Sequence, residues 1–133
     1  MTQSPVPAAL DQNVLAVVDD SAFRSSLQFA LELDGFLVKV FETGDMLLQL
    51  DPLPGRACLV IDYVLPRTDG IEIVNALRER GIDFPTILMA TNPPLRLRRQ
   101  LFEAGLGLIE KPLLGNHLSE AIRSALAGRS VAR

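Results

Sequence analysis

Hydrophobic residues occur in this chain in two alternating patterns. Short continuous apolar runs are typical of strands that are buried on both faces of a parallel sheet. Between these runs, apolar residues recur every three or four positions, which predicts amphipathic helices. The runs predict strands at residues 14–18, 36–41, 57–61, 86–90 and 106–109, and the periodic segments predict helices at residues 21–33, 44–50, 71–81, 95–105 and 117–128.

Local signals support these elements. Ser21 stands where an N-cap is expected for the first helix, and Thr43 is placed to cap the second. Lys39 interrupts the second apolar run, as a charged residue often does in an edge strand. Five successive strand–helix units of this length predict an α/β fold, namely a doubly wound parallel sheet with helices on both faces.

The composition is typical of one globular domain. The chain has 133 residues, and 48% of them are hydrophobic, which suffices for a single packed core. The net charge of −3 gives no reason to expect direct binding to nucleic acid. No apolar stretch approaches the ~18 residues of a membrane span, and the first residues lack the pattern of a secretory signal. We therefore expect a cytoplasmic protein without a membrane partner, with its domain at residues 13–128 and flexible termini at residues 1–12 and 129–133.

Neither the single cysteine nor the single histidine indicates a functional site. Cys58 has no second cysteine to form an intrachain disulfide, and it lies within an apolar run. We expect it to be buried and unreactive. His117 has no second His or Cys with which to bind a transition metal, and we expect it at the surface of the last helix.

Four of the predicted strands end in a polar residue that is able to take part in chemistry. Asp19 and Asp20 follow the first strand, Asp62 the third, Thr91 the fourth and Lys111 the fifth. Ligand sites in open α/β sheets form just beyond the carboxyl ends of the strands. We therefore expect these five side chains, which are far apart in the sequence, to line one crevice.

The residue types at these strand ends suggest phosphoryl chemistry assisted by Mg²⁺. Three carboxylates held together repel one another, and a bound hard cation such as Mg²⁺ relieves that repulsion. An aspartate beside the cation is able to attack phosphorus, and an ammonium and a hydroxyl suit the phosphoryl oxygens. Asp62, Lys111 and Thr91 fit those roles. In the alternative interpretation, Asp19, Asp20 and Asp62 are ordinary strand-end polar residues or helix caps.

Through these residues the chain resembles the receiver domain of two-component response regulators. The matching pieces are VVDD at 17–20, IDYVLPRTDG at 61–70, LMAT at 88–91 and IEKP at 109–112. The resemblance extends from about residue 13 to residue 128 and is greatest to the FixJ-type subgroup. It implies a flavodoxin-like fold, in which a five-stranded parallel sheet of order 2-1-3-4-5 carries five helices.

The resemblance also implies a role for each matching position. Asp62 is the implied phosphoacceptor, Lys111 is expected to pair with the phosphoryl group, and Thr91 is expected to reorient towards it. Asp20 is expected to bind Mg²⁺ directly and Asp19 largely through water. The implied set of Mg²⁺ ligands is Asp19, Asp20, Asp62 and the backbone carbonyl of Val64. A receiver is a phosphoacceptor protein rather than an enzyme, although it assists its own phosphorylation and dephosphorylation.

A few positions depart from the pattern of the family. The position three residues before the lysine usually carries Tyr or Phe, whose ring rotates inward as the threonine moves. Here it is Leu108, which cannot report phosphorylation in that way. Pro93 and Pro94 follow the threonine and stiffen its loop, so we expect an atypical output surface. Val64 and Pro93 flank the expected path of attacking water and cannot orient it, which predicts slow self-dephosphorylation.

The leading hypothesis is a stand-alone receiver that is phosphorylated on Asp62 by a histidine kinase or histidine phosphotransfer protein. The signal would pass by contact with an unidentified downstream protein, and a homodimer would form through the fourth helix, fifth strand and fifth helix. The rival is a pseudo-receiver that binds partners without phosphorylation. A small Mg²⁺-dependent phosphatase and a receiver excised from a longer chain are further alternatives. Arg96, Arg98 and Arg99 form either a solvated face or a docking surface for an acidic partner.

Overall fold

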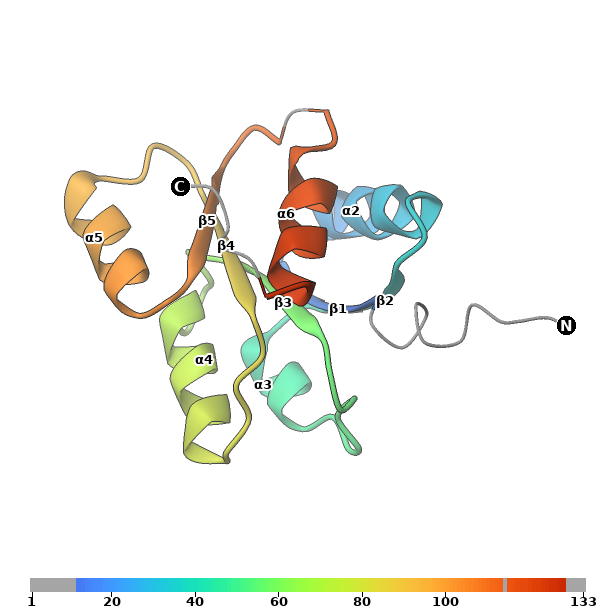
Figure 1. Ribbon diagram of the computed structural model, residues 1–133, viewed down its shortest axis with the longest axis horizontal. Coiled ribbons are helices and arrows are strands. Elements are labelled where there is room, and N and C mark those ends of the chain that lie inside the picture. Colours follow the sequence, from blue (N-terminus) through green and yellow to red (C-terminus); the bar gives the residue numbers. More distant parts are fainter. Residues whose placement is uncertain (1–11, 114, 129–133) are drawn as a thin grey trace, which may run out of the picture.

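The computed structural model describes residues 12–113 and 115–128. Within them, five strands alternate with five helices (Figure 1). Of the termini predicted to be flexible, 1–12 and 129–133, all residues except residue 12 lie outside the described residues. The elements are β1 (Asn13–Val17), α2 (Ser21–Leu33), β2 (Leu37–Phe41), α3 (Gly44–Leu48), β3 (Cys58–Asp62), α4 (Gly70–Glu79), β4 (Thr86–Ala90), α5 (Leu95–Glu103), β5 (Gly107–Glu110) and α6 (His117–Leu126).

The strands form one parallel sheet in the order β2-β1-β3-β4-β5, which confirms the predicted fold class. The strand β1 pairs with β2 on one side and with β3 on the other. The chain order therefore reverses between β1 and β3, and this switch point is where open α/β sheets bind their ligands. The ends of β1 and β3 are the places at which the three candidate carboxylates occur.

The sheet separates two hydrophobic cores. Successive side chains of a strand point to opposite faces, so Leu15 and Val17 join one core while Val14 and Ala16 join the other. The first core is covered by α3, α4 and α5, and the second by α2 and α6 (Figure 1). Helices on both faces explain why β1, β3 and β4 read as continuous apolar runs in the sequence.

The strand β2 is an edge strand, as the charged residue within its apolar run predicted. It pairs only with β1 among the described strands, and Lys39 is exposed. The adjoining helix α2 buries fewer residues than its apolar content suggests. Leu27 and Leu31 are buried, whereas Phe29 is 64% exposed and Leu33 72% exposed. The apolar face of α2 that packs on the sheet is therefore narrow.

The structure also settles what was expected of Cys58 and His117. Cys58 is buried in β3, where burial raises the pKa of its thiol to about 12, so it is inert as expected. His117 is exposed at the first turn of α6. No helix in the described part of the chain is long and apolar enough to cross a lipid bilayer.

Candidate functional site

The carboxyl ends of neighbouring strands bring the candidate residues to one edge of the sheet. Asp62 is the last residue of β3 and pairs in register with Met89 of β4. The backbone N–H of Tyr63 donates to the carbonyl of Met89 at 2.9 Å, and that of Lys111 donates to the carbonyl of Ala90 at 2.8 Å. These bonds continue the sheet pairing beyond its last residues, so the side chains that follow have a defined position.

Asp62 and Lys111 form an ion pair at the centre of this edge. The Lys111 Nζ lies 2.5 Å from the Asp62 Oδ1, and their side chains are 29% and 7% exposed, respectively. A charge-assisted contact of this length is a strong one. The peptide bond that follows the lysine, Lys111-Pro112, is cis. The ion pair thus places the lysine in contact with the carboxylate that the sequence predicts to react.

The groups around Asp62 have opposing effects on the pKa of its carboxyl. Burial raises the pKa of its carboxyl above the usual value, and this is the largest effect. The hydrogen bond and positive charge of Lys111 lower that pKa, whereas the negative charges of Asp19 and Asp20 raise it. The net result is a raised pKa, so this carboxylate holds its negative charge at a cost. A cation at this edge would reduce that cost.

The helix α2 begins at the acidic loop, which carries the acidic pair Asp19 and Asp20. The N-cap of α2 is not the residue that the sequence predicted. Asp20, rather than Ser21, is the N-cap: its Oδ1 accepts from the backbone N–H of Ala22 at 2.9 Å and of Phe23 at 3.2 Å. Ser21 is the first helical residue. An aspartate one position earlier caps at least as well as a serine, and its charge suits the positive end of the helix dipole. This cap fixes the direction of the Asp20 carboxylate.

The loop that carries the acidic pair is held from the other side by an arginine. The Arg24 guanidinium donates from Nη1 to the backbone carbonyl of Val18 at 2.9 Å and to that of Asp19 at 3.1 Å. Asp19 itself is exposed. The backbone of the loop is thereby fixed, while the outermost carboxylate remains in contact with solvent.

The oxygen atoms at this edge fit a cation that keeps much of its water. Among residues 12–113 and 115–128, no three His, Cys, Asp or Glu side chains come together as a ready-made metal cluster. Mg²⁺ does not require one, because it is usually bound by one or two carboxylates together with water. Asp19, Asp20, Asp62 and Val64 all line the same groove, and each of them offers oxygen. The donor set therefore suits a hard divalent ion.

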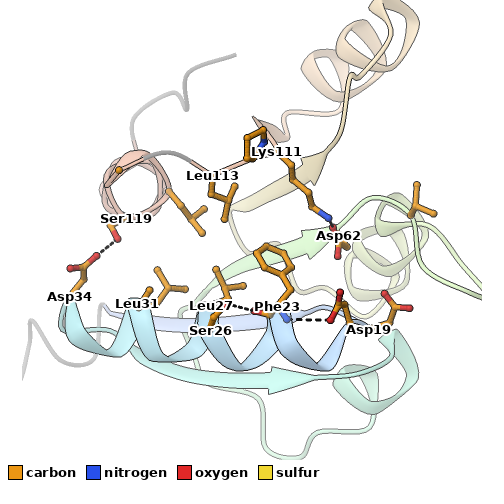
Figure 2. A pocket seen from close by; sticks show the side chains of 16 residues that line it. Asp19, Phe23, Ser26, Leu27, Leu31, Asp34, Asp62, Lys111, Leu113 and Ser119 are labelled. Carbon is orange, nitrogen blue, oxygen red and sulfur yellow. Dashed lines mark hydrogen bonds and ion pairs between the residues drawn. The ribbon is translucent and has the colours of Figure 1, made fainter.

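The ion pair divides the predicted crevice into two adjoining hollows. A groove of about 600 Å³ runs from Asp62 and Lys111 along α2 to the hydrogen bond between Asp34 and Ser119 (Figure 2). A smaller hollow of about 220 Å³ lies between the ends of β3 and β4 and is lined by Thr91, Pro93 and Leu97, with Asp62 and Lys111 as shared walls. The acidic pair faces the first hollow and Thr91 faces the second.

The β4–β5 side of the site is aliphatic where the family usually places an aromatic residue. Leu108 is 5% exposed and belongs to the same core as Ala90, Leu97 and Leu101. It fills core space. Thr91 is exposed at the end of β4. The residue after it, Asn92, has a left-handed backbone with φ of 47° and leads into the two prolines.

The sequence left two interpretations open for the three arginines of α5, a solvated face or a docking surface. Among the three arginines of α5, Arg98 pairs with Glu110 of β5 at 3.0 Å, while Arg96 and Arg99 are exposed, which suits the solvated-face interpretation. Phe23 lies in the first turn of α2. It is half-buried, and its ring lies over Lys111. Sequence reasoning missed this contact, because the two residues are 88 positions apart and no local pattern connects them.

Comparison with known proteins decides the family. Residues 14–123 match the family model of the response regulator receiver domain. The chain belongs to this family. Receiver domains are phosphoacceptor signalling domains of two-component systems, they interact with histidine kinases and phosphotransfer proteins, and they generally bind Mg²⁺ at the phosphorylation site. The family predicted from the sequence is thereby confirmed.

Individual relatives of this receiver support the same assignment. It is 32% identical over 117 residues to the transcriptional regulatory protein FixJ of Bradyrhizobium diazoefficiens, covering 86% of this chain and 56% of the relative. It is 32% identical over 114 residues to the response regulator MprA of Mycobacterium leprae, covering 85% of this chain and 50% of the relative. The chain thus spans about half the length of the curated relatives that it matches.

Solved structures agree with the fold of this receiver. Full-length FixJ from B. japonicum superimposes with a TM-score of 0.79 at 29% identity, covering 87% of this chain and 58% of that chain. The FixJ-N crystal structure superimposes with a TM-score of 0.78 at 29% identity, covering 91% of this chain and 97% of that chain. The resemblance to FixJ therefore appears both in sequence and in structure.

Proposed function

We propose that this receiver accepts a phosphoryl group on Asp62 from a histidine kinase or a histidine phosphotransfer protein. The observation that carries the proposal is the ion pair between the buried Asp62 and Lys111 at the switch point of the sheet. Asp19 and Asp20 face the same groove. A carboxylate and an ammonium in contact beside two further carboxylates are the groups that phosphoryl transfer to aspartate requires.

In the proposed reaction, a carboxylate oxygen of Asp62 forms a bond to phosphorus. The bond between phosphorus and the donor nitrogen of a phosphohistidine breaks, and the nitrogen keeps the electron pair. The product is an acyl phosphate. Lys111 stays beside the reacting carboxylate and pairs with a phosphoryl oxygen as negative charge moves there. Thr91, which lines the smaller hollow with Asp62, donates a hydrogen bond from its hydroxyl to another phosphoryl oxygen.

The residues proposed to hold Mg²⁺ are Asp20 and Asp62 directly, Asp19 through water, and Val64 through its backbone carbonyl. When bound, Mg²⁺ neutralises part of the charge on the phosphoryl oxygens. The N-cap geometry of Asp20 leaves Oδ1 on the backbone of α2, so we propose that its second oxygen binds the ion. Val64 is 77% exposed and Pro93 is a wall of the smaller hollow, and neither side chain can orient water for hydrolysis. We therefore propose a long-lived phosphoaspartate.

Signal output is proposed to occur by protein contact. Residues 13–128 are proposed to act as one receiver domain, and a homodimer through α5, β5 and α6, a downstream protein partner and a cytoplasmic location stay predictions. The rival function is that of a pseudo-receiver, which binds its partners without phosphorylation. Leu108 favours this rival, because an aliphatic side chain packed in the core stands at the position where a receiver usually has a movable aromatic ring.

Phosphorylation by a small phosphodonor separates the two functions. The protein is incubated with acetyl phosphate and Mg²⁺, and its intact mass is measured. We expect the addition of one phosphoryl group in the wild type and none in Asp62→Asn. Asp45→Asn, which changes an exposed carboxylate on α3, serves as the matched control and should gain the group as the wild type does. A wild type that remains unmodified at high donor concentration would favour the pseudo-receiver.

A further inference from the structure

Phe23 contacts both charged parts of the site. Its backbone N–H donates to the Asp20 Oδ1 at 3.2 Å, so its place in the first turn of α2 is tied to the acidic loop. Its ring lies over the Lys111 Nζ, which is 5.1 Å from the ring centroid. Figure 2 shows the ring directed from α2 towards Lys111 and Asp62 at the mouth of the groove. One residue thus connects the loop of Asp19 and Asp20 to the Lys111 ammonium.

The distance is within the range of a cation–π interaction. An ammonium within about 6 Å of a ring centroid is attracted by the negative face of the ring, and the attraction grows as water is removed. The Lys111 side chain is 29% exposed, and the carboxylate that it pairs with is 7% exposed. The ammonium is therefore only partly hydrated, and it has an anion and a ring as neighbours. Both contacts favour the same position of Nζ.

We propose that Phe23 is a positioning residue for phosphoryl transfer, which acts by holding the Lys111 ammonium beside Asp62. The proposal rests on the proposed function of Asp62 and extends it to a residue of α2. A cation–π attraction does not depend on the direction of the N–H bonds. The ammonium is therefore able to turn its donors from the carboxylate to a phosphoryl oxygen without leaving the ring. A water molecule in place of the ring would compete for those donors.

A purely structural role for Phe23 predicts a different result. The ring also touches the core beneath α2, so its removal lowers stability under either interpretation. Only the positioning role links an aromatic face at residue 23 to the rate of phosphorylation, whereas a ring-current shift at Lys111 tests the contact itself. The test therefore compares Phe23→Leu with Phe23→Tyr, because tyrosine retains the ring face and leucine retains only apolar bulk. Phe29→Leu is the matched control, since Phe29 lies on the same helix, is 64% exposed and does not line the groove.

The first measurement is the rate of phosphorylation by acetyl phosphate at saturating Mg²⁺, with a small donor chosen so that protein docking plays no part. We expect Phe23→Leu to be slower by roughly three- to tenfold, the range that corresponds to a partly desolvated cation–π contact. Phe23→Tyr should be within about twofold of the wild type, and Phe29→Leu should match the wild type. Equal rates for Phe23→Leu and the wild type would overturn the positioning role and leave the function of Asp62 intact.

The second measurement is independent of phosphorylation. In the NMR spectrum of the unmodified protein at one fixed pH, the side-chain protons of Lys111 next to Nζ should be shifted upfield by the ring. The shift should disappear in Phe23→Leu and persist in Phe23→Tyr and Phe29→Leu. An unshifted lysine in the wild type would overturn the proposal, even if Phe23→Leu does not fold. A wild type that takes no phosphoryl group at all would overturn the proposed function, and this role of Phe23 with it.

Discussion

The residues on the two sides of Asp62 are fixed in place by different kinds of interaction. The acceptor half, defined here as Asp19, Asp20, Asp62 and Lys111, is held by an ion pair, an N-cap and a ring over an ammonium. The relay half, defined here as Thr91, Pro93, Pro94 and Leu108, consists of one exposed hydroxyl, two rigid prolines and a leucine packed in the core. Charged contacts therefore position the residues of the acceptor half, whereas chain stiffness and apolar packing position those of the relay half.

This difference separates the acceptance of a phosphoryl group from its communication. Substitutions in the acceptor half other than at the buried Asp62 should change the rate of phosphorylation and have limited effect on folding, because Lys111 and the two outer carboxylates are partly or fully exposed. Substitutions in the relay half should change stability and have limited effect on the rate, because Leu108 lies in the core. An aliphatic relay half also implies an output that does not depend on the movement of an aromatic ring.

The largest effect is expected from Lys111→Ala. Removal of the ammonium takes away the positive charge that accompanies the phosphoryl oxygens, and loss of one such donor slows group-transfer enzymes on the order of a hundredfold. We expect a similar fall in the rate of phosphorylation by acetyl phosphate, followed by intact-mass measurement over time. Arg98→Ala removes another cation, one that pairs with Glu110 at 3.0 Å, and should leave the rate unchanged. A rate for Lys111→Ala close to that of the wild type would remove charge as the basis of the acceptor half.

The next effect concerns the relay half and appears as stability. Leu108→Tyr inserts a larger ring with a hydroxyl into a core position that is 5% exposed and lies among packed aliphatic residues. Overpacking of this kind typically costs about 1–3 kcal/mol. We expect a lower free energy of unfolding in urea with no change in the rate of phosphorylation. A variant as stable as the wild type would mean that the relay half does have room for the usual ring.

A smaller effect is expected for the lifetime of the phosphoaspartate. Val64 is 77% exposed beside Asp62 and has no polar atom in its side chain. Val64→Asn places a hydrogen-bonding group there that is able to orient water. We expect loss of the phosphoryl group to become several-fold faster, measured by intact mass after removal of the donor, whereas Val64→Leu should behave as the wild type. An unchanged lifetime in Val64→Asn would show that water is excluded by other groups.

The smallest effect is a gain of stability in Asp62→Asn in Mg²⁺-free buffer. Burial raises the pKa of Asp62 in the folded protein, so the folded state binds its proton more tightly than the unfolded chain does. The free energy of unfolding of the wild type therefore falls as pH rises from the ordinary pKa of an aspartate through the raised one. Asp62→Asn should lack this fall and should have a higher Tm than the wild type at neutral pH. A lower Tm for the variant would mean that the pair with Lys111 outweighs burial.

Much of the fold was predictable, because each strand and helix leaves a local mark on the sequence. The apolar runs that became β1, β3 and β4 are buried on both faces, and the structure places them where the runs predicted to within about one residue. Lys39 marked the edge strand in the same way. The N-cap of α2 was wrong by one residue, since Asp20 and Ser21 are both good caps and only the backbone geometry distinguishes them.

The site was predictable only as far as strand ends define it. The meeting of Asp62 and Lys111 follows from parallel topology, because the carboxyl ends of the strands share one edge. The division into two hollows and the ring of Phe23 over Lys111 do not follow from any local pattern. They depend on how α2 lies against the loop after β5, and that arrangement is a property of tertiary packing.

The central claim is that Asp62 itself carries the phosphoryl group, and chemical trapping tests it most directly. The protein is phosphorylated with acetyl phosphate and Mg²⁺ and then treated with sodium borohydride, which reduces an aspartyl phosphate to homoserine. Peptide mass spectrometry then locates the reduced residue. The account predicts homoserine at position 62 in the wild type and at no carboxylate in Asp62→Asn. Homoserine at Asp19 or Asp20, or none in a protein that has gained the phosphoryl mass, would contradict it.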